Sequence, residues 1–221
     1  MTNKKKLVNA LITARAGSKR LPNKNLKYIC GKPLIVWSIE AAKNSKFVDK
    51  IYVSTDSNEI AEISSKNGAL VPRLRSESLS GDQTSSLEIV LDFEEYFTND
   101  SGGEILLMQP TSPLRLSSHI DKLMKFVRES GCDQCIAVRE ISKFLKLTTK
   151  FFYFDSINYI PNGSMYYSNL NFLKKERNFF SASSEIFLMD DFHSIDIDTQ
   201  DDWNIAEACL KELLSRKNYF D

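Results

Sequence analysis

The chain has 221 residues, of which 42% are hydrophobic, so it can bury one good core and we expect a single domain over residues 1–221. Its 29 Lys and Arg residues balance its 29 Asp and Glu residues, which gives a formal net charge of zero. This balance argues against a nucleic-acid-binding protein, because such proteins carry a basic excess. Four scattered cysteines are too few for a disulfide scaffold and suit a reducing cytoplasm.

A short apolar run follows three consecutive lysines near the N-terminus and superficially resembles a signal peptide. The run is broken by Asn9 and is followed at once by Arg15, Lys19 and Arg20, which is more typical of a buried first strand. No apolar run approaches the length of a membrane span. We therefore expect a cytoplasmic protein that binds neither membranes nor nucleic acids.

Strand and helix patterns alternate along the first 140 residues, which predicts an α/β fold of parallel strands joined by right-handed crossovers. The predicted strands cover residues 7–14, 50–55, 69–74, 105–108 and 134–138. One predicted helix begins at Pro33, and three more cover residues 57–67, 83–97 and 117–129. Ligands of such sheets bind at the carboxyl ends of the strands, where this chain carries polar residues.

Beyond residue 140 this alternation stops. Residues 144–160 are rich in Phe, Tyr and Thr, which predicts a β-rich arm at about 141–182. Residues 161–163 predict a turn, and residues 164–168, 185–189 and 194–198 predict short strands. The chain closes with a predicted helix over 199–216, whose start resembles a capping box.

A basic loop at residues 15–25 follows the first predicted strand. It holds two Arg, two Lys, one Gly, one Ser and two Asn. Backbone N–H groups of a tight turn and cationic side chains can converge on phosphate oxygens, so the loop predicts an anion cradle. Its single glycine argues against both a Walker-type P-loop and the dinucleotide fingerprint. The alternative is a surface loop whose cations are simply solvated.

Asp196 and Asp198 stand two residues apart near the C-terminus. On an extended strand both carboxylates point to the same face and can reach one cation. Mg²⁺ typically takes one or two protein carboxylates and leaves its other positions to phosphate and water. Equally, Asp198 could serve only to cap the terminal helix.

Two further polar stretches could contact a ligand. Residues 109–115 form a stiff turn whose two prolines leave Gln109 and its neighbours as hydrogen-bonding groups, although an ordinary turn is as good an interpretation. Asn162 and Tyr166 could place an amide and a phenol over a cavity, or Tyr166 could pack in the core.

The remaining candidates for chemistry favour structural roles. Cys132 and Cys135 form a lone CxxC pattern, which indicates strand-entry packing rather than a zinc or redox site. His119 and His193 lie far apart in sequence with no nucleophile motif beside them, and we interpret both as surface or structural residues.

Together these stretches resemble the acylneuraminate cytidylyltransferases, the CMP-sialic acid synthetases. The matching stretches occur in the family's order and cover nearly the whole chain. They are residues 14–25, 31–34, 53–56, 74–75, 81–86, 109–115, 162–166 and 195–199.

The resemblance implies a reaction in which CTP and a nine-carbon 2-keto sugar acid, such as N-acetylneuraminate or legionaminate, give a CMP-sugar and pyrophosphate with the help of Mg²⁺. Such products feed surface polysaccharide biosynthesis. It also implies a three-layer, Rossmann-like nucleotide-diphosphosugar transferase fold with a mixed, mostly parallel sheet. The implied assembly is a homodimer in which the β-rich arm reaches the partner's active site.

The resemblance assigns roles by position. The residues that would hold the triphosphate and stabilise the leaving pyrophosphate are Arg15, Ser18, Lys19 and Lys24, with Arg15, Lys19 and Lys24 as the catalytic candidates. Those that would contact the rest of the nucleotide are Asn25, Arg75, Thr84 and Ser86. Those that would face the sugar acid are Gln109, Lys146, Asn162 and Tyr166. The Mg²⁺ ligands would be Asp196 and Asp198.

Two departures from the family pattern bear on the acceptor. Between residues 142 and 161 the family usually has a longer segment with arginines for the sugar carboxylate, whereas this chain has three lysines and no arginine there. Ser76 replaces a proline that usually follows the family's Leu-Arg.

Other functions are compatible with parts of the pattern. One is CMP activation of an eight-carbon acid, although the turn at 109–115 favours the nine-carbon branch. Another is a non-catalytic nucleotide-binding homologue, which the intact Asp196 and Asp198 argue against. A glycosyltransferase with an Asp-x-Asp metal site would normally carry that pair in mid-chain.

Overall fold

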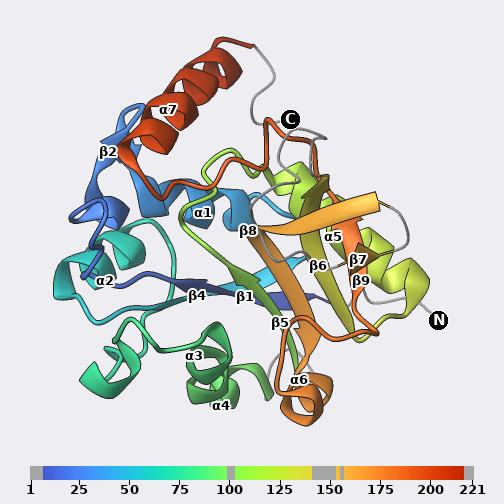
Figure 1. The fold of residues 1–221 in the computed structure, drawn as a ribbon. Coiled ribbons are helices and arrows are strands. Elements are labelled where there is room, and N and C mark those ends of the chain that lie inside the picture. The colour runs from blue at the N-terminus through green and yellow to red at the C-terminus, as the bar shows by residue number, and fades with distance from the viewer. Residues whose placement is uncertain (1–6, 99–102, 141–152, 155–156, 217–221) are drawn as a thin grey trace.

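The computed structural model describes residues 7–98, 103–140, 153–154 and 157–216. A seven-stranded sheet forms its centre (Figure 1). Its strands are β1 (Val8–Thr13), β4 (Val48–Ser54), β5 (Glu104–Met108), β6 (Gln134–Glu140), β7 (Tyr153–Phe154), β8 (Ile157–Asn169) and β9 (Glu185–Leu188). A two-stranded hairpin of β2 (Tyr28–Ile29) and β3 (Lys32–Pro33) stands apart from it.

The strand order β4-β1-β5-β8-β6-β9 makes the sheet mixed, and β7 pairs with β8 at its end. The pairs β1–β4, β1–β5 and β6–β9 are parallel, whereas β8 runs antiparallel to both β5 and β6. The prediction of a mixed, mostly parallel sheet is therefore confirmed.

Helices cover both faces of the sheet, so the domain has three layers. They are α1 (Leu34–Lys43), α2 (Asn58–Lys66), α3 (Ser86–Asp92), α4 (Glu94–Thr98), α5 (Ser117–Ser130), α6 (Leu170–Glu176) and α7 (Gln200–Ser215), with 3-10 turns η1 (Lys24–Leu26) and η2 (Glu77–Leu79). Alternate residues of β1 face opposite layers: Ala10 and Ile12 pack with α1, α2 and α5, and Leu11 packs with α3 and α6 (Figure 1).

A third apolar cluster joins the hairpin, α1 and α7. The cluster buries Trp37 of α1, Trp203 of α7, and Ile197, which precedes α7. This cluster brings the C-terminal segment against the start of the chain, which places Asp198 beside the basic loop. Two distant parts of the sequence thereby meet at the carboxyl end of β1.

Three predicted elements differ from the structure. Residues 69–74 form only one bridge, between Leu70 and Tyr52, because Pro72 lacks the N–H that would extend the ladder. The helix predicted over 83–97 is divided at the fully buried Phe93 into α3 and α4. Residues 194–198 are not a strand, although Ile197 N donates to the carbonyl of Thr111 at 2.9 Å.

The region predicted as an arm is also different. Residues 161–163 are an irregularity inside β8, where its register with β6 shifts between Ile136 and Val138, and not a turn between two strands. β8 lies in the middle of the main sheet, and α6, which was not predicted, follows it. Residues 141–152 of the predicted arm, including Lys146, lie outside the described residues.

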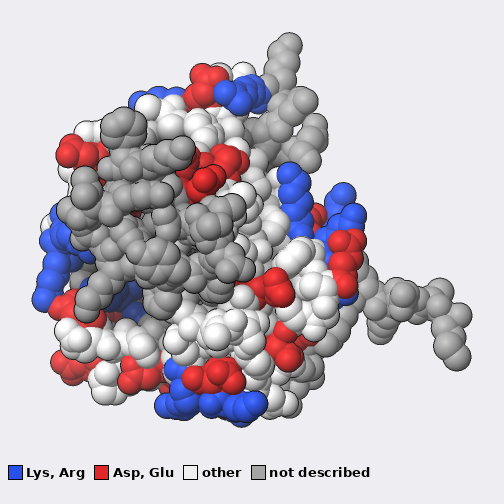
Figure 2. All heavy atoms as spheres, turned by 45° about the vertical axis from the view of Figure 1, so that its right-hand side comes forward, with Lys and Arg blue, Asp and Glu red and all other residues white. Residues whose placement is uncertain are grey.

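The surface agrees with the balanced composition. On the uncovered part of the face in Figure 2, acidic and basic side chains lie near one another. Within the described ranges, no helix combines the length and apolar character needed to cross a bilayer.

Candidate active site

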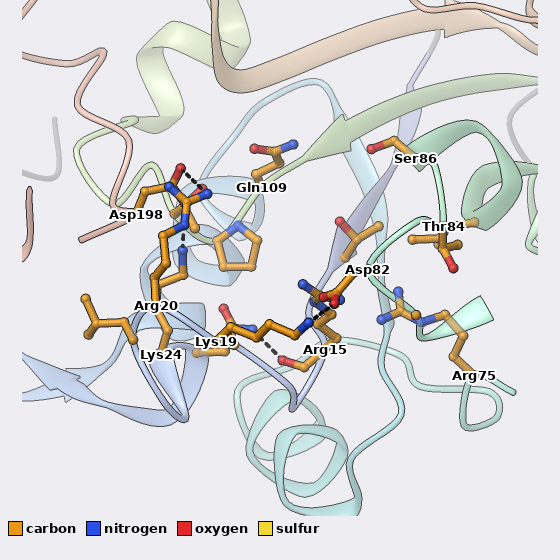
Figure 3. Close-up of a pocket in the computed structure, with 18 of the residues that line it drawn as sticks. Arg15, Lys19, Arg20, Lys24, Arg75, Asp82, Thr84, Ser86, Gln109 and Asp198 are labelled. Carbon is orange, nitrogen blue, oxygen red and sulfur yellow. Dashed lines mark hydrogen bonds and ion pairs between the residues drawn. The ribbon is translucent and has the colours of Figure 1, made fainter. Parts of the chain in front are cut away.

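A cavity of about 510 Å³ opens at the carboxyl ends of β1 and β5, as expected for ligand sites of parallel sheets (Figure 3). Four segments enclose it: the basic loop after β1, residues 75–89, the turn after β5, and the C-terminal segment at Asp198. The predicted site residues that line it are Arg15, Ser18, Lys19, Lys24, Asn25, Arg75, Thr84, Ser86, Gln109 and Asp198.

The basic loop is held in place by hydrogen bonds at both ends. The backbone N–H of Ala16 donates to Asp56 Oδ1 at 2.8 Å. Asn25, which is buried in the turn η1, donates from Nδ2 to the carbonyl oxygen of Arg15 at 3.0 Å. The amide of Asn25 therefore shapes the loop, and its side-chain oxygen and second N–H are left for a nucleotide.

Two carboxylates pair with the four cations of this loop (Figure 3). Asp82 contacts Lys19 and lies 2.7 Å from Arg15 Nη1. Asp198 lies 3.3 Å from both Arg20 Nη2 and Lys24 Nζ. Arg20 and Asp82 were not among the predicted site residues, although both belong to stretches that carry the family resemblance. Only the folded chain shows that they meet.

The far wall of the cavity carries Arg75, whose side chain is buried. Its Nη1 has no hydrogen-bond partner among the described residues, and its Nε reaches Ser80 Oγ only at 3.4 Å. Burial lowers the pKa of Arg75, and the Asp56 carboxylate opposes that shift. A buried guanidinium with an unused donor can bind an acceptor group of a ligand. Thr84 and Ser86 lie on the same side (Figure 3).

Gly163 allows two polar side chains to approach the backbone of β8. A Cβ atom at this position would lie 2.8 Å from Gln109 Oε1 and 3.3 Å from Asp196 Oδ2. The φ angle of Gly163 is +74°, a region that favours glycine. The fully buried Arg115 links the turn after β5 to β8. Its Nη1 donates to the carbonyls of Gln109 at 3.2 Å and Ser164 at 2.6 Å.

The residues around Asp196 fit a divalent cation. Asp196 Oδ1 is buried and has no hydrogen-bond partner among the described residues. Burial raises the pKa of Asp196, the Thr111 hydroxyl opposes this rise, and the negative charge of Asp198 adds to it. An orphaned carboxylate oxygen beside a second carboxylate is a donor set that Mg²⁺ satisfies. Asp196 itself does not line the cavity, whereas Asp198 does.

The capping role considered for Asp198 belongs to its neighbour. Thr199 is the N-cap of α7, and its Oγ1 accepts a hydrogen bond from the backbone N–H of Asp202 at 3.2 Å. Asp202 in turn accepts hydrogen bonds from the backbone N–H groups of Asp198 and Thr199. The carboxylate of Asp198 is thus directed to the cations of the basic loop and not to the helix.

Asn162 and Tyr166 do not line the cavity, so their contact with a sugar stays a prediction. Asn162 is buried, donates to Ser194 Oγ at 2.9 Å and accepts from Ser164 N at 3.0 Å. Tyr166 packs with Phe179 and Phe180 at ring distances of 5.8 Å, and burial raises its pKa to about 12. Both side chains have the contacts of structural residues.

The two histidines lie together, which their sequence separation did not indicate. The ring centroids of His119 and His193 are 4.5 Å apart. Nδ1 of His193 lies 2.8 Å from the Asp190 carboxylate, and Nδ1 of His119 accepts from Leu116 N at 3.1 Å. A backbone donor at Nδ1 places the proton of neutral His119 on Nε2, so this nitrogen lacks the lone pair that a metal requires. We therefore interpret the pair as a structural cluster, in agreement with the interpretation of each histidine from the sequence.

This cluster predicts a loss of stability in acid. Burial and the neighbouring His193 lower the pKa of His119 to about 4, and Asp190 only partly opposes them. Its stabilising contribution is complete above the ordinary pKa of about 6.5 and is lost as the pH falls toward 4. Between pH 7.5 and 4.5, the free energy of unfolding in urea should fall by about 2 kcal/mol more for the wild type than for His119→Gln. Equal losses in both proteins would contradict this expectation.

The chain is similar to known cytidylyltransferases. Residues 9–215 match the cytidylyltransferase family model. An N-acylneuraminate cytidylyltransferase of Streptococcus agalactiae serotype III (strain NEM316) is 34% identical over 212 residues, which cover 87% of this chain and 51% of the relative. A CMP-N,N'-diacetyllegionaminic acid synthase of Legionella pneumophila subsp. pneumophila (strain Philadelphia 1) is 33% identical over 222 residues, which cover 91% of this chain and 95% of the relative.

Solved structures share the fold. A CMP:2-keto-3-deoxy-manno-octonic acid synthetase complexed with CTP superposes with a TM-score of 0.72 at 15% identity, over 93% of this chain and 99% of the other. A cytidylyltransferase from Leptospira borgpetersenii gives a TM-score of 0.64 at 20% identity, over 93% and 87%. The present chain spans about half the length of the streptococcal relative that it matches. On its match over residues 9–215, the chain belongs to the cytidylyltransferase family.

Proposed function

We propose that this chain transfers CMP from CTP to the anomeric hydroxyl of a nine-carbon 2-keto sugar acid and releases pyrophosphate. The observation that carries the proposal is the convergence of four cations, the buried Arg75 and Asp198 on one cavity at the carboxyl end of β1. The names of the relatives at 33–34% identity, which refer to N-acylneuraminate and to diacetyllegionaminic acid, support a nonulosonate acceptor.

The cations suit the triphosphate of the nucleotide. Lys19 is exposed and Arg15 is half-buried, whereas Lys24 lies deeper, with a side chain that is only 12% exposed. A partly buried ammonium stabilises negative charge more strongly than a solvated one, because the local dielectric is lower. Lys24 is thus the group we assign to the charge that builds on the leaving pyrophosphate.

The reaction needs orientation and charge stabilisation, and no covalent nucleophile. The anomeric oxygen of the sugar forms a bond to the α-phosphorus while the bond from that phosphorus to the bridging oxygen of the β-phosphate breaks. The hydroxyl releases its proton, and pyrophosphate departs with the electron pair of the broken bond. Cationic side chains that hold the phosphates in line favour this step by positioning and by offsetting charge.

Asp196 and Asp198 are the groups we assign to Mg²⁺, in agreement with the orphaned oxygen of Asp196. The bound cation would supply positive charge that offsets the phosphate oxygens. A metal on Asp198 would also compete with Arg20 and Lys24 for that carboxylate and make both side chains available to phosphate.

Of the three candidates for acceptor binding that the structure describes, Gln109 lines the cavity, whereas Asn162 and Tyr166 do not. An eight-carbon acid is the second candidate, because a synthetase for such an acid shares the fold at 15% identity. The more similar relatives favour the nine-carbon acid. We also propose a cytoplasmic homodimer that feeds surface polysaccharide synthesis, which the family resemblance supports and with which the four free cysteines agree.

One assay tests the proposed function. The protein is incubated with Mg²⁺, each of the four nucleoside triphosphates and a panel of eight- and nine-carbon keto-sugar acids, and pyrophosphate is measured. We expect release only with CTP and a nine-carbon acid. Release without an acid, or with UTP as readily as with CTP, would count against cytidylyl transfer, and preference for an eight-carbon acid would overturn the acceptor assignment.

A further inference from the structure

Asp82 and Asp198 are the two acidic residues in the lining of a cavity that also carries five cationic side chains. The two carboxylate oxygens of Asp82 are divided between two loop cations: Oδ1 lies 2.7 Å from Arg15 Nη1 and Oδ2 contacts Lys19 (Figure 3). The hydrogen bonds from Lys19 and Arg15 lower the pKa of Asp82, so its carboxylate is ionised throughout the neutral range. It presents oxygens to these cations as a phosphate would.

The pairing of Asp82 is suited to exchange. The side chains of Asp82 and Lys19 are 37% and 78% exposed, and exposed ion pairs contribute little to stability. Asp82 lies in a short turn in which Thr84 N donates to the carbonyl of Gly81 at 3.3 Å. The other carboxylate in the lining, Asp198, pairs with the exposed Arg20 as well, but its second partner, Lys24, has a side chain that is only 12% exposed.

We propose that Asp82 is a built-in counter-ion that competes with the phosphates of CTP and with pyrophosphate for Arg15 and Lys19. This inference rests on the proposed function, because it requires polyphosphate binding by those cations. A triphosphate carries more negative charge than one carboxylate and can displace it. As pyrophosphate leaves, Asp82 pairs again with both cations, which lowers the affinity for the product and shortens its residence.

Counter-ion exchange has a signature that distinguishes it from a supporting role. If Asp82 held the cations in position for phosphate, its removal would weaken binding. If it competes with phosphate, its removal must tighten binding and slow product release. Release of product limits turnover in many enzymes, so the second case also affects the rate under saturating substrate.

The test is pyrophosphate binding measured by calorimetry in excess EDTA, so that only the protein's own charges respond. Asp82→Asn should bind pyrophosphate about fivefold more tightly than wild type, the size expected for removing one like charge about 4 Å from the phosphate in a water-exposed site. Asp82→Glu keeps the charge and should resemble wild type. The matched control is Glu77→Gln, which removes an exposed charge from η2, outside the cavity lining.

In the synthetic reaction Asp82→Asn should show a lower KM for CTP and stronger inhibition by pyrophosphate than wild type. Unchanged or weaker pyrophosphate binding in Asp82→Asn, with wild-type binding intact, would overturn the counter-ion role alone. An equal gain in Glu77→Gln would reduce the effect to net charge and overturn it as well. Failure of the wild type to bind CTP or pyrophosphate would instead overturn the proposed function, and the counter-ion with it.

Discussion

Replacement of Asp198 by asparagine should lower kcat for pyrophosphate release on the order of 10²–10³-fold while the fold stays intact. The side chain of Asp198 lies 3.3 Å from both Arg20 Nη2 and Lys24 Nζ, and we propose that it binds the cation together with Asp196. Asparagine keeps the shape but loses the charge that these roles require. Because the side chain of Asp198 is 45% exposed, thermal unfolding should change little.

Asp201→Asn is the matched control for this experiment. Asp201 is exposed, lies in the first turn of α7 only three residues away, and does not line the cavity. Its replacement removes the same charge from the same segment and should leave kcat close to that of wild type. If Asp198→Asn retained wild-type turnover, or if Asp201→Asn lost as much, the assignment of Asp198 to the site would be wrong.

Gly163→Ala should lower turnover on the order of 10²-fold, because small displacements of positioned groups have effects of that size. The added Cβ would lie 2.8 Å from Gln109 Oε1 and 3.3 Å from Asp196 Oδ2, so both side chains must move. The φ angle of +74° adds backbone strain of about 1 kcal/mol for a non-glycine residue. Steady-state kinetics and urea unfolding measure the two effects separately.

Gly131→Ala separates the displacement from the strain. Gly131 has a φ of +68°, and a Cβ there would meet nothing within 4 Å. Both variants should lose similar stability from the backbone, but only Gly163→Ala should lose activity. Equal activity in the two variants would show that the approach of Gln109 and Asp196 to Gly163 has no part in the reaction.

Local patterns located most of the elements. The buried strand after the N-terminus, the helix over 117–129 and the capping box before the last helix were predicted from neighbouring residues, and the structure confirms all three. Errors occurred where distant contacts overrode local preference. The helix predicted over 83–97 is divided at the fully buried Phe93, and β8 continues past a predicted turn because β6 pairs with it on both sides, at Pro161 and at Tyr166.

The candidate site also combines features that are local in sequence with features that depend on distant contacts. The basic loop and the aspartate pair were visible in sequence because their residues are adjacent, and a chemical type at close spacing is a local signal. The pairing of Asp82 with Arg15 and Lys19 spans more than 60 positions of sequence, so no spacing rule could indicate it. The contact of His119 with His193 was missed for the same reason.

The class of fold, the basic loop after the first strand and the family can all be predicted from sequence, because each depends on the order and spacing of nearby residues. The folded chain is needed to show which carboxylate faces which cation, and that Gly163 lets Gln109 and Asp196 converge. These contacts depend on the packing of β1, β5, β8 and the C-terminal segment against one another. Electrostatic interactions act over a few ångströms in space, whatever the distance along the chain.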